Sequence, residues 1–306
     1  MTRAKKLCTT LICSGLIGSM AACKVTDDAI AASQQMTSTA NALNDYYSAL
    51  DAGVTDTISL YELDAAISGI PFGSDDRKLS ESMRDELEKR KELADALARL
   101  ASAMSTLSNS KTASDVQTSA TQLGNELISV QALPGGSPVP DAVGKAGNFL
   151  LQIVQQHEDK KAARAIDETL RVVGDLFEKE KPTYDSIART HDREASQVAQ
   201  DLLKKNAVDP SPMLSPALRP FDLTALPPST SMQTSLKTLA LSRLQQATEE
   251  ATKKDESASA AMLASLREMS SRVHLVATEK PMPLRGVPFS LKLVEDWAQS
   301  WSASLI

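Results

Sequence analysis

The chain has 306 residues, 24% of them charged and 4% aromatic, and its formal net charge is −6 at pH 7. Nucleic-acid binding is not expected of such a chain, because it needs clustered Lys and Arg on the surface. With few aromatic residues, the core has to be built from small and aliphatic side chains, as in the contact faces of packed helices.

Residues 1–22 have the pattern of a secretion signal. Basic Arg3, Lys5 and Lys6 precede the apolar run 7–22, which several Thr, Ser and Gly residues dilute. The run is shorter than the roughly 20 predominantly apolar residues that a transmembrane helix needs. It fits a secretory signal that ends in small residues, so we expect a signal peptide that is removed from the mature chain.

The end of this segment, Met20-Ala21-Ala22-Cys23, resembles the lipobox of bacterial lipoproteins, with Met20 in the place of the usual Leu. The resemblance implies that Cys23 is acylated and becomes the first residue of the mature chain. Several acyl chains together give stable membrane anchoring. Lys24, rather than Asp, implies an outer-membrane address with the protein facing the periplasm. The alternative is ordinary cleavage after Ala21 and secretion without lipid.

The cysteine count supports lipidation. Cys8 and Cys13 lie in the segment that is removed, so Cys23 is the one cysteine left in the mature chain. A single cysteine forms no internal disulfide, which leaves lipid attachment as its clearest role. Removal of residues 1–22 also takes away three basic residues and no acidic one, so the mature chain is more acidic than the precursor.

Heptad spacing of apolar residues predicts an all-α fold. In four stretches the apolar residues follow a 4-3-4-3 spacing, which places them on one stripe of a helix. Each stretch lasts about two heptads, fewer than the three or four of a committed coiled coil. We therefore expect a bundle of long antiparallel helices with short coiled-coil-like seams. The four stripes begin at Met36, Leu93, Val116 and Met262.

Prolines set most of the expected boundaries, because proline cannot continue a helix interior. Helices are expected near 26–51, 59–69, 75–109, 112–132, 141–179, 182–206, 230–279 and 290–304. The expected organisation is a helical bundle at 23–206, a proline-rich connection at 207–229, and a C-terminal part at 230–306. This last part holds one long helix and a short Trp-containing helix that pack on the bundle. The connection is expected to cross along the bundle, with a free tether as the alternative.

The stretch from Asp51 to Glu62 partly resembles an EF-hand calcium loop. Asp51 and Glu62 take the first and last ligand positions, but Gly53 and Asp56 stand where a ligand and the turn glycine are needed. The simpler interpretation is that Gly53 ends one helix, and that Ser59 and Glu62 form a capping box that opens the next.

Residues for catalysis or metal binding are scarce. His157 and His191 follow apolar helix faces, and helix geometry separates them by about 20 Å or more; together with His274 they are expected to border the core. Ser108 and Lys111 match one nucleophile motif without its companion motifs. No phosphate-binding loop, metalloprotease or dinucleotide motif occurs. We expect no enzyme activity, no catalytic residue, no metal and no cofactor.

Glu86 and Arg90 stand at two positions where a stripe is expected to be apolar. One interpretation is an i,i+4 ion pair, and another is a polar layer that fixes the register of the helices. The interpretation that we favour is that Leu87 carries the stripe around the helix.

The last expected helix has Val294, Trp297 and Trp301 on one face. Trp is frequent at interfaces, so these residues are the best candidates for binding a protein partner if the bundle leaves their face open. Otherwise they form a lid on the core.

The expected function is that of a membrane-anchored lipoprotein of the bacterial envelope, acting as a structural or protein-interaction component. The alternative is a lipoprotein that binds a small or apolar ligand between helices. A cavity of roughly several hundred Å³ between helices would favour this alternative.

Overall fold

A computed structural model describes most of the chain, and it is all-α. The described residues are 4–105, 113–155, 159–210, 213–214, 230–278 and 289–303, with side chains from residue 30 onward except near some helix ends. The helices are α1 (Ala4–Ser68), α2 (Ser74–Ser105), α3 (Ala113–Ser129), α4 (Asp141–Gln155), α5 (Asp159–Lys204), α7 (Thr230–Ala277) and α8 (Phe289–Ala303). No strand occurs in these ranges, so the predicted helical bundle is confirmed.

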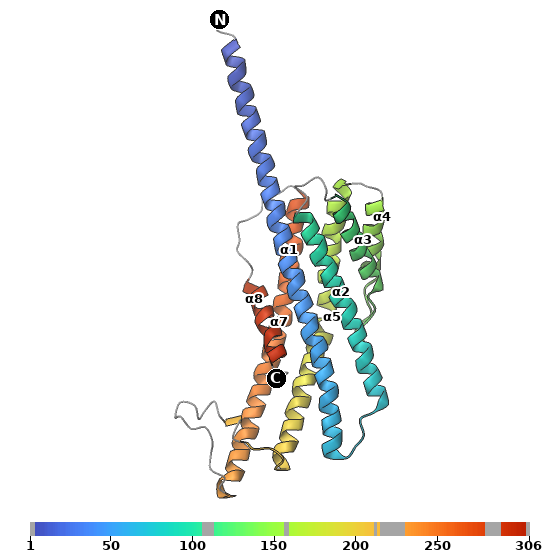
Figure 1. Cartoon of the computed structure of the whole chain (residues 1–306), viewed down its shortest axis with the longest axis vertical. Helices are drawn as coiled ribbons and strands as arrows, with labels where there is room; N and C mark the ends of the chain where they lie inside the picture. Colours follow the sequence, from blue (N-terminus) through green and yellow to red (C-terminus); the bar gives the residue numbers. More distant parts are fainter. Residues whose placement is uncertain are drawn as a thin grey trace.

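The bundle is formed by consecutive helices that run in alternating directions (Figure 1). Helix α1 packs on α2, α5 on α7 and α3 on α4, while α8 lies against both α1 and α7. The N-terminal part of α1 extends beyond the other helices (Figure 1). Over the described part of the chain, none of the helices is long and apolar enough to cross a bilayer.

The helices differ strongly in length, and the two shortest of the inner helices, α3 and α4, cover only one half of the bundle. Helices α3 and α4 have 17 and 15 residues, whereas α2 and α5 have 32 and 46. At 1.5 Å per residue, α3 covers about half the length of α2. The short pair packs beside the half of the bundle nearest the N-terminal extension, and the other half has no such cover (Figure 1).

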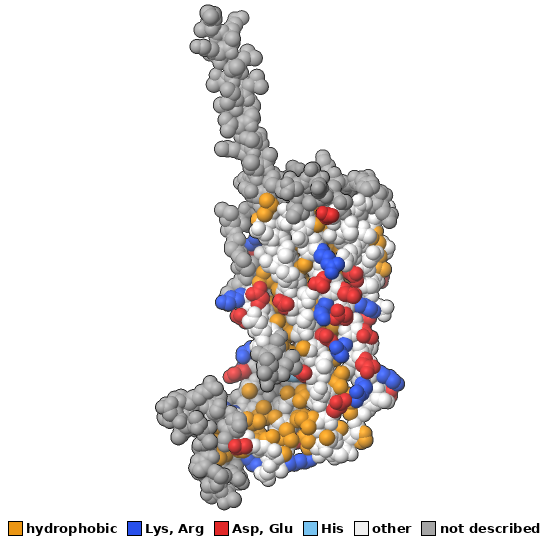
Figure 2. Space-filling view, viewed as in Figure 1, with side chains coloured by type: hydrophobic (Ala, Val, Ile, Leu, Met, Phe, Trp, Pro, Cys, Tyr) orange, Lys and Arg blue, Asp and Glu red, His pale blue; other side chains and the backbone are white. Residues whose placement is uncertain are grey.

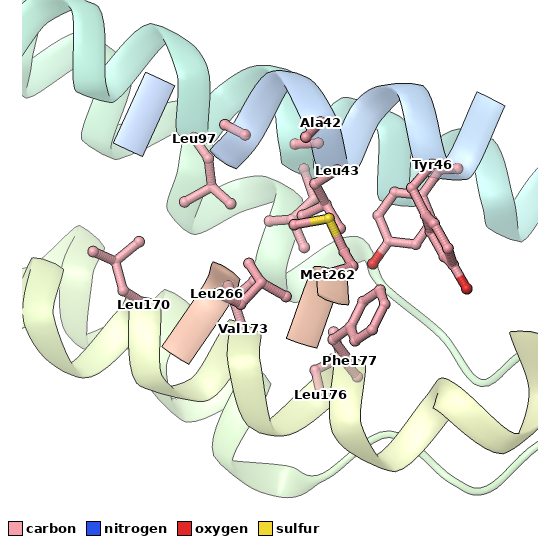
Figure 3. Packing of buried hydrophobic residues seen from close by; sticks show 14 of the residues in the cluster. Ala42, Leu43, Tyr46, Leu97, Leu170, Val173, Leu176, Phe177, Met262 and Leu266 are labelled. Carbon is pink, nitrogen blue, oxygen red and sulfur yellow. The ribbon is translucent and has the colours of Figure 1, made fainter. Parts of the chain in front are cut away.

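Most of the core is built from small and aliphatic side chains, as the composition predicts, but a cluster of buried aromatic rings is part of it. This cluster includes Tyr46, Tyr47, Phe177 and Tyr184. Figure 3 shows side chains from α1, α2, α5 and α7 meeting between the helices. Three of the predicted stripes begin at residues in this core, and the stripe that begins at Met36 is buried throughout. Fully buried members of the core include Met36, Leu43, Leu50, Leu97, Leu170, Met262 and Leu266.

Helix α1 continues through the stretch where the sequence predicted a break. Gly53 was expected to end a helix, with a capping box at Ser59, but α1 runs unbroken to Ser68. A Cβ atom at Gly53 would lie 2.0 Å from Cζ3 of Trp301, so the glycine serves the close approach of α8. The hydroxyl of Thr57 donates within the helix to the carbonyl oxygen of Gly53 at 2.7 Å. The predicted break is therefore wrong.

Two further predicted boundaries are also wrong. Helix α5 runs through Pro182, because Phe177 and Tyr184, on either side of it, are both buried in the same core and hold the two halves in line. The helix predicted at 141–179 is instead divided between α4 and α5. Helix α4 packs on both α3 and α5, which buries its apolar residues Val143, Ala146 and Leu150.

The proline-rich connection is described at its start and at 213–214. Asn206 has a φ of 57°, which ends α5 by a left-handed cap. Leu214 is buried in a small second cluster with Leu203 and Ala240, so the chain at 213–214 packs on α5 and α7. The other parts of the predicted connection, 211–212 and 215–229, lie outside the described residues.

A buried ion-pair network crosses the interior beside the end of α3. Arg90 is fully buried, and its Nε donates to Oε2 of Glu180 at 3.0 Å while Nη2 donates to Oε1. Nη1 donates to the carbonyl oxygen of Glu86, and Nη2 also donates to that of Gln131, each at 2.8 Å. Oε2 of Glu86 accepts the backbone N–H of Gln131. The guanidinium therefore ties together α2, α5 and the loop that follows α3.

Tyrosines complete this network on the side of α1. The hydroxyl of Tyr184 donates to Glu180, and it lies 3.4 Å from the hydroxyl of Tyr47. Burial raises the pKa of both Tyr47 and Tyr184 above the ordinary value, so both phenols keep their protons as donors. Burial would lower the pKa of Arg90, but Tyr184 and Glu180 outweigh it and raise that pKa.

Glu86 and Arg90 therefore form a buried polar layer, which is one of the interpretations that the sequence left open. Both side chains are buried between helices, and Glu86 and Arg90 also form the i,i+4 pair. Leu87 is buried as well and continues the apolar stripe, but beside Glu86 and Arg90 and not in their place. The interpretation that we favoured is therefore incomplete.

We expect Arg90→Met to lower the free energy of unfolding by roughly 3–5 kcal/mol, because it leaves Glu180 buried without its cation. The matched control is Arg84→Met, which breaks the partly exposed Arg84–Asp51 pair (2.9 Å) and should cost less than about 1 kcal/mol. Urea unfolding followed by circular dichroism measures both. Equal losses for the two variants would contradict a special role for Arg90.

Candidate functional site

A groove of about 790 Å³ opens between α1, α2 and α5 in the half of the bundle that α3 and α4 do not cover. Its apolar lining includes Val54, Tyr61, Phe72, Leu79, Met83 and Ile187. Its polar lining is formed mainly by hydroxyl groups, from Thr57, Ser80, Ser137, Thr183, Ser186 and Thr190. The groove therefore offers apolar contact and neutral hydrogen-bonding groups to a ligand.

The loop between α3 and α4 closes one end of the groove. Gln131 is held by Arg90 and Glu86, and Leu133 is buried in the core. Gly135 then adopts a φ of 71°, which glycine tolerates without strain. A Cβ atom at Gly136 would lie 3.1 Å from Oγ1 of Thr183, so the loop passes close to α5 there. After this turn the chain enters α4, so α3 and α4 do not cover the groove.

The groove carries little charge. Asp76 is the one charged side chain among its described lining residues. At the rim, Arg77 pairs with Glu62 at 2.6 Å, and its guanidinium lies 5.8 Å from the centroid of the Phe72 ring. Phe72 in turn stacks on Tyr61, with ring centroids 5.3 Å apart. The stacked rings of Tyr61 and Phe72, together with Arg77, therefore form an aromatic wall on one side of the groove.

Exposed apolar side chains gather at the same end of the bundle. Figure 2 shows hydrophobic side chains crowded over the C-terminal end of α1 and the N-terminal end of α2, away from the N-terminal extension. Among the large ones, Leu63 is 43% exposed, Leu79 is 55% and Ile70 is 70%. Apolar residues clustered on a surface in this way mark an interaction site more often than isolated ones do.

The Trp-containing face of α8 is not open to a partner. Val294 is fully buried and Trp297 is 5% exposed, while Trp301 is partly buried. Trp297 stacks on Tyr46 of α1, with ring centroids 4.9 Å apart, and its Nε1 donates to Oδ1 of Asp255 at 2.8 Å. The condition set for partner binding at Val294, Trp297 and Trp301 is therefore not met, and these residues form a lid on the core.

The calcium-loop alternative also fails. Asp51 and Glu62 lie on the continuous helix α1, where their spacing separates them by about 16 Å along the axis. Asp51 instead pairs with Arg84, and Glu62 with Arg77, both on α2. The two carboxylates thus join α1 to α2 and do not surround an ion.

The two histidines that the structure describes, His191 and His274, have different partners. His191 is partly buried, with Nδ1 3.3 Å from Oδ1 of Asp192 and Nε2 4.0 Å from Oδ2 of Asp56. His274 is more exposed than expected, and its Nδ1 is 2.8 Å from Oδ2 of Asp167. Within the described part of the chain, no group of three or more His, Cys, Asp or Glu side chains is arranged to hold a metal ion.

Other predicted residues lie outside the described side chains. His157, Ser108 and Lys111 belong to the ranges 156–158 and 106–112, which the structure does not describe. Cys23 lies on the helical backbone of α1, and its side chain is not described. Acylation of Cys23 stays a prediction.

Comparison with known proteins adds no relative. No protein-family model matches the chain, and no curated protein or solved structure matches it either. A function for this chain therefore has to follow from its own residues.

We expect Gly53→Ala to destabilise the fold by about 1–3 kcal/mol, because the new methyl group would force the ring of Trp301 to move. Gly144→Ala is the control, since a Cβ there meets no atom within 4 Å, and helical Ala is favoured over Gly by about 0.5–1 kcal/mol. Urea unfolding followed by Trp fluorescence compares them. Equal stability of the two variants would argue against close packing of α8 on Gly53.

Proposed function

We propose that this chain is a lipoprotein, anchored through Cys23 to the periplasmic side of a bacterial membrane, that acts by binding another protein in the groove between α1, α2 and α5. The observation that carries the proposal is the groove itself, with exposed apolar residues around it at the end of the bundle farthest from Cys23. Lys24 favours the outer membrane as the site of anchoring.

The continuous helix α1 supports this arrangement. At 1.5 Å per residue, about 60 Å of helix separates Cys23 from Leu63. An acylated Cys23 would thus hold one end of α1 at the bilayer, while the groove would be carried well into the periplasm. A partner bound there need not touch the membrane that carries the anchor.

The chemistry of the groove favours a protein segment with apolar side chains and without net negative charge. The hydroxyl groups of the groove's Ser and Thr residues match the hydrogen-bonding groups of a peptide chain, and apolar walls match its side chains. Asp76 and the net charge of −6 disfavour an anionic occupant. The described lining residues include no Lys or Arg, whose positive charge would attract a phosphate or a carboxylate.

A second candidate is a small apolar ligand in the same groove. The volume of about 790 Å³ is within the range of roughly 300–1,000 Å³ that is usual for small-molecule sites. The crowd of exposed apolar residues beside the groove favours the protein partner over this candidate, because a small ligand would leave Leu63 and Ile70 uncovered.

The groove is tested by Leu79→Lys, with Leu239→Lys as the matched control. Leu79 lines the groove and is 55% exposed, while Leu239 on α7 is 47% exposed and lies outside the groove lining. After chemical crosslinking in intact cells, we expect wild type and Leu239→Lys to capture the same protein, and Leu79→Lys to lose at least 90% of it. A lysine at this position has to be desolvated when the apolar side chains of a partner cover it.

Equal capture by all three proteins would rule out the groove as the binding site. Loss in Leu79→Lys with normal circular dichroism and an unchanged urea midpoint supports it. If no protein is captured and native mass spectrometry of the wild type shows a bound small molecule that Leu79→Lys lacks, the second candidate replaces the first.

The anchor is tested separately with Cys23→Ser. We expect wild type to incorporate labelled palmitate and to sediment with membranes, and the serine variant to do neither, because the hydroxyl cannot form the thioether. A variant that still sediments with membranes, beside a wild type without label, would remove the lipoprotein proposal. That result would leave the groove untouched.

A further inference from the structure

Helix α8 is held on the bundle by its two tryptophans. The Trp297 ring stacks on Tyr46 of α1, and its Nε1 donates to Asp255 of α7. The Trp301 ring lies over Gly53 of α1, with its centroid 4.8 Å from that of His191 on α5. Both tryptophans of the chain are therefore in contacts that exist only while α8 is docked.

Two carboxyl groups meet beneath these rings. Asp255 is 4% exposed, and its Oδ1 accepts the hydrogen bond from Trp297. Its Oδ2 is buried without a hydrogen-bond partner, and so is Oδ2 of Asp192 on α5. Ser259 of α7 donates to Asp185 of α5, so the packing of these two helices places Asp255, one turn before Ser259, and Asp192, two turns after Asp185, on facing sides. The charge of Asp192 acts on Asp255 there. A single proton held between the two carboxyl groups would therefore provide a hydrogen bond for side chains that otherwise have unpaired buried oxygens.

We propose that α8 is a proton-controlled latch, in which a proton shared by Asp192 and Asp255 keeps α8 docked and loss of that proton weakens the docking. Without the proton, two negative charges face each other in a buried site with two unpaired oxygens. Withdrawal of α8 relieves both costs, because water then reaches the carboxylates. It also uncovers Val294, Trp297 and Tyr46.

Burial raises the pKa of Asp255 from its ordinary value of 3.8 to about 7, which the hydrogen bond from Trp297 opposes and the charge of Asp192 reinforces. The docked form therefore binds a proton between about pH 4 and pH 7 that the undocked form releases. Docking is favoured most at acidic pH and weakens as the pH rises through about 7.

Other charged and titratable groups surround the pair on every element packed against it. The α5 side contributes His191 and Asp185, of which Asp185 pairs with Lys181 at 2.7 Å. On α1 the groups are Tyr46 and Asp56. Lys253 and Lys254 of α7 and Asp296 of α8 line a hollow beside Trp297. His191 is in direct contact with Asp192, so the experiment has to separate it from the acid pair.

The test is amide hydrogen exchange of α8 in the full-length chain at pH 6 and pH 8.5, corrected for the intrinsic pH dependence of exchange. We expect protection of 289–303 to fall at least tenfold between the two values, while protection of α3, which does not pack on α8, changes less than twofold. Trp fluorescence follows the same transition, because both tryptophans are on α8.

Three variants decide the cause. Asp255→Asn should remove the pH dependence, because its amide donates to Asp192 at every pH while its oxygen still accepts from Trp297. Asp192→Asn should act in the same way, and it serves if Asp255→Asn does not fold. His191→Gln should keep the tenfold fall. Constant protection of α8 in wild type, a fall that persists in both Asn variants, or a fall abolished by His191→Gln would each overturn the proposal.

Discussion

The buried guanidinium of Arg90 determines where the half of the bundle that α3 and α4 cover comes to an end. It binds Glu180 of α5 and the carbonyl oxygen of Gln131, while Glu86 accepts the N–H of Gln131. A buried charge needs all of these partners, since breaking such a pair costs several kcal/mol. The loop after α3 is therefore fixed part-way along α2, and α4 turns back from that point. The groove is the space that α3 and α4 leave uncovered.

Heptad spacing was enough to predict the helical bundle and much of its core, because a stripe that begins at Met36 or Met262 has few ways to be buried other than against another helix. Local rules failed where tertiary contacts decide. Gly53 looks like a helix end, yet its missing side chain makes room for Trp301. Pro182 looks like a break, yet buried residues on both sides keep α5 continuous. Both misreadings come from residues whose role lies in another segment of the chain.

The groove could not be predicted for a similar reason. It depends on α3 and α4 being about half as long as α2, and the sequence pattern merged α4 with the start of α5. The buried acid pair gave no signal either, because Asp192 and Asp255 are ordinary surface residues in a helical pattern until α8 covers them. The anchor is the opposite case, since the pattern around Cys23 is local and needs no fold.

The binding of a protein segment in the groove is the central claim, and photocrosslinking from within the groove tests it most directly. A photoreactive amino acid is placed at Thr190, which lines the groove, or at the exposed Thr238 of α7, which does not. The full-length chain is then irradiated in the cells that make it. The account predicts one discrete protein adduct from position 190 and none from position 238. Absence of an adduct at 190, or the same adducts from both positions, would contradict it.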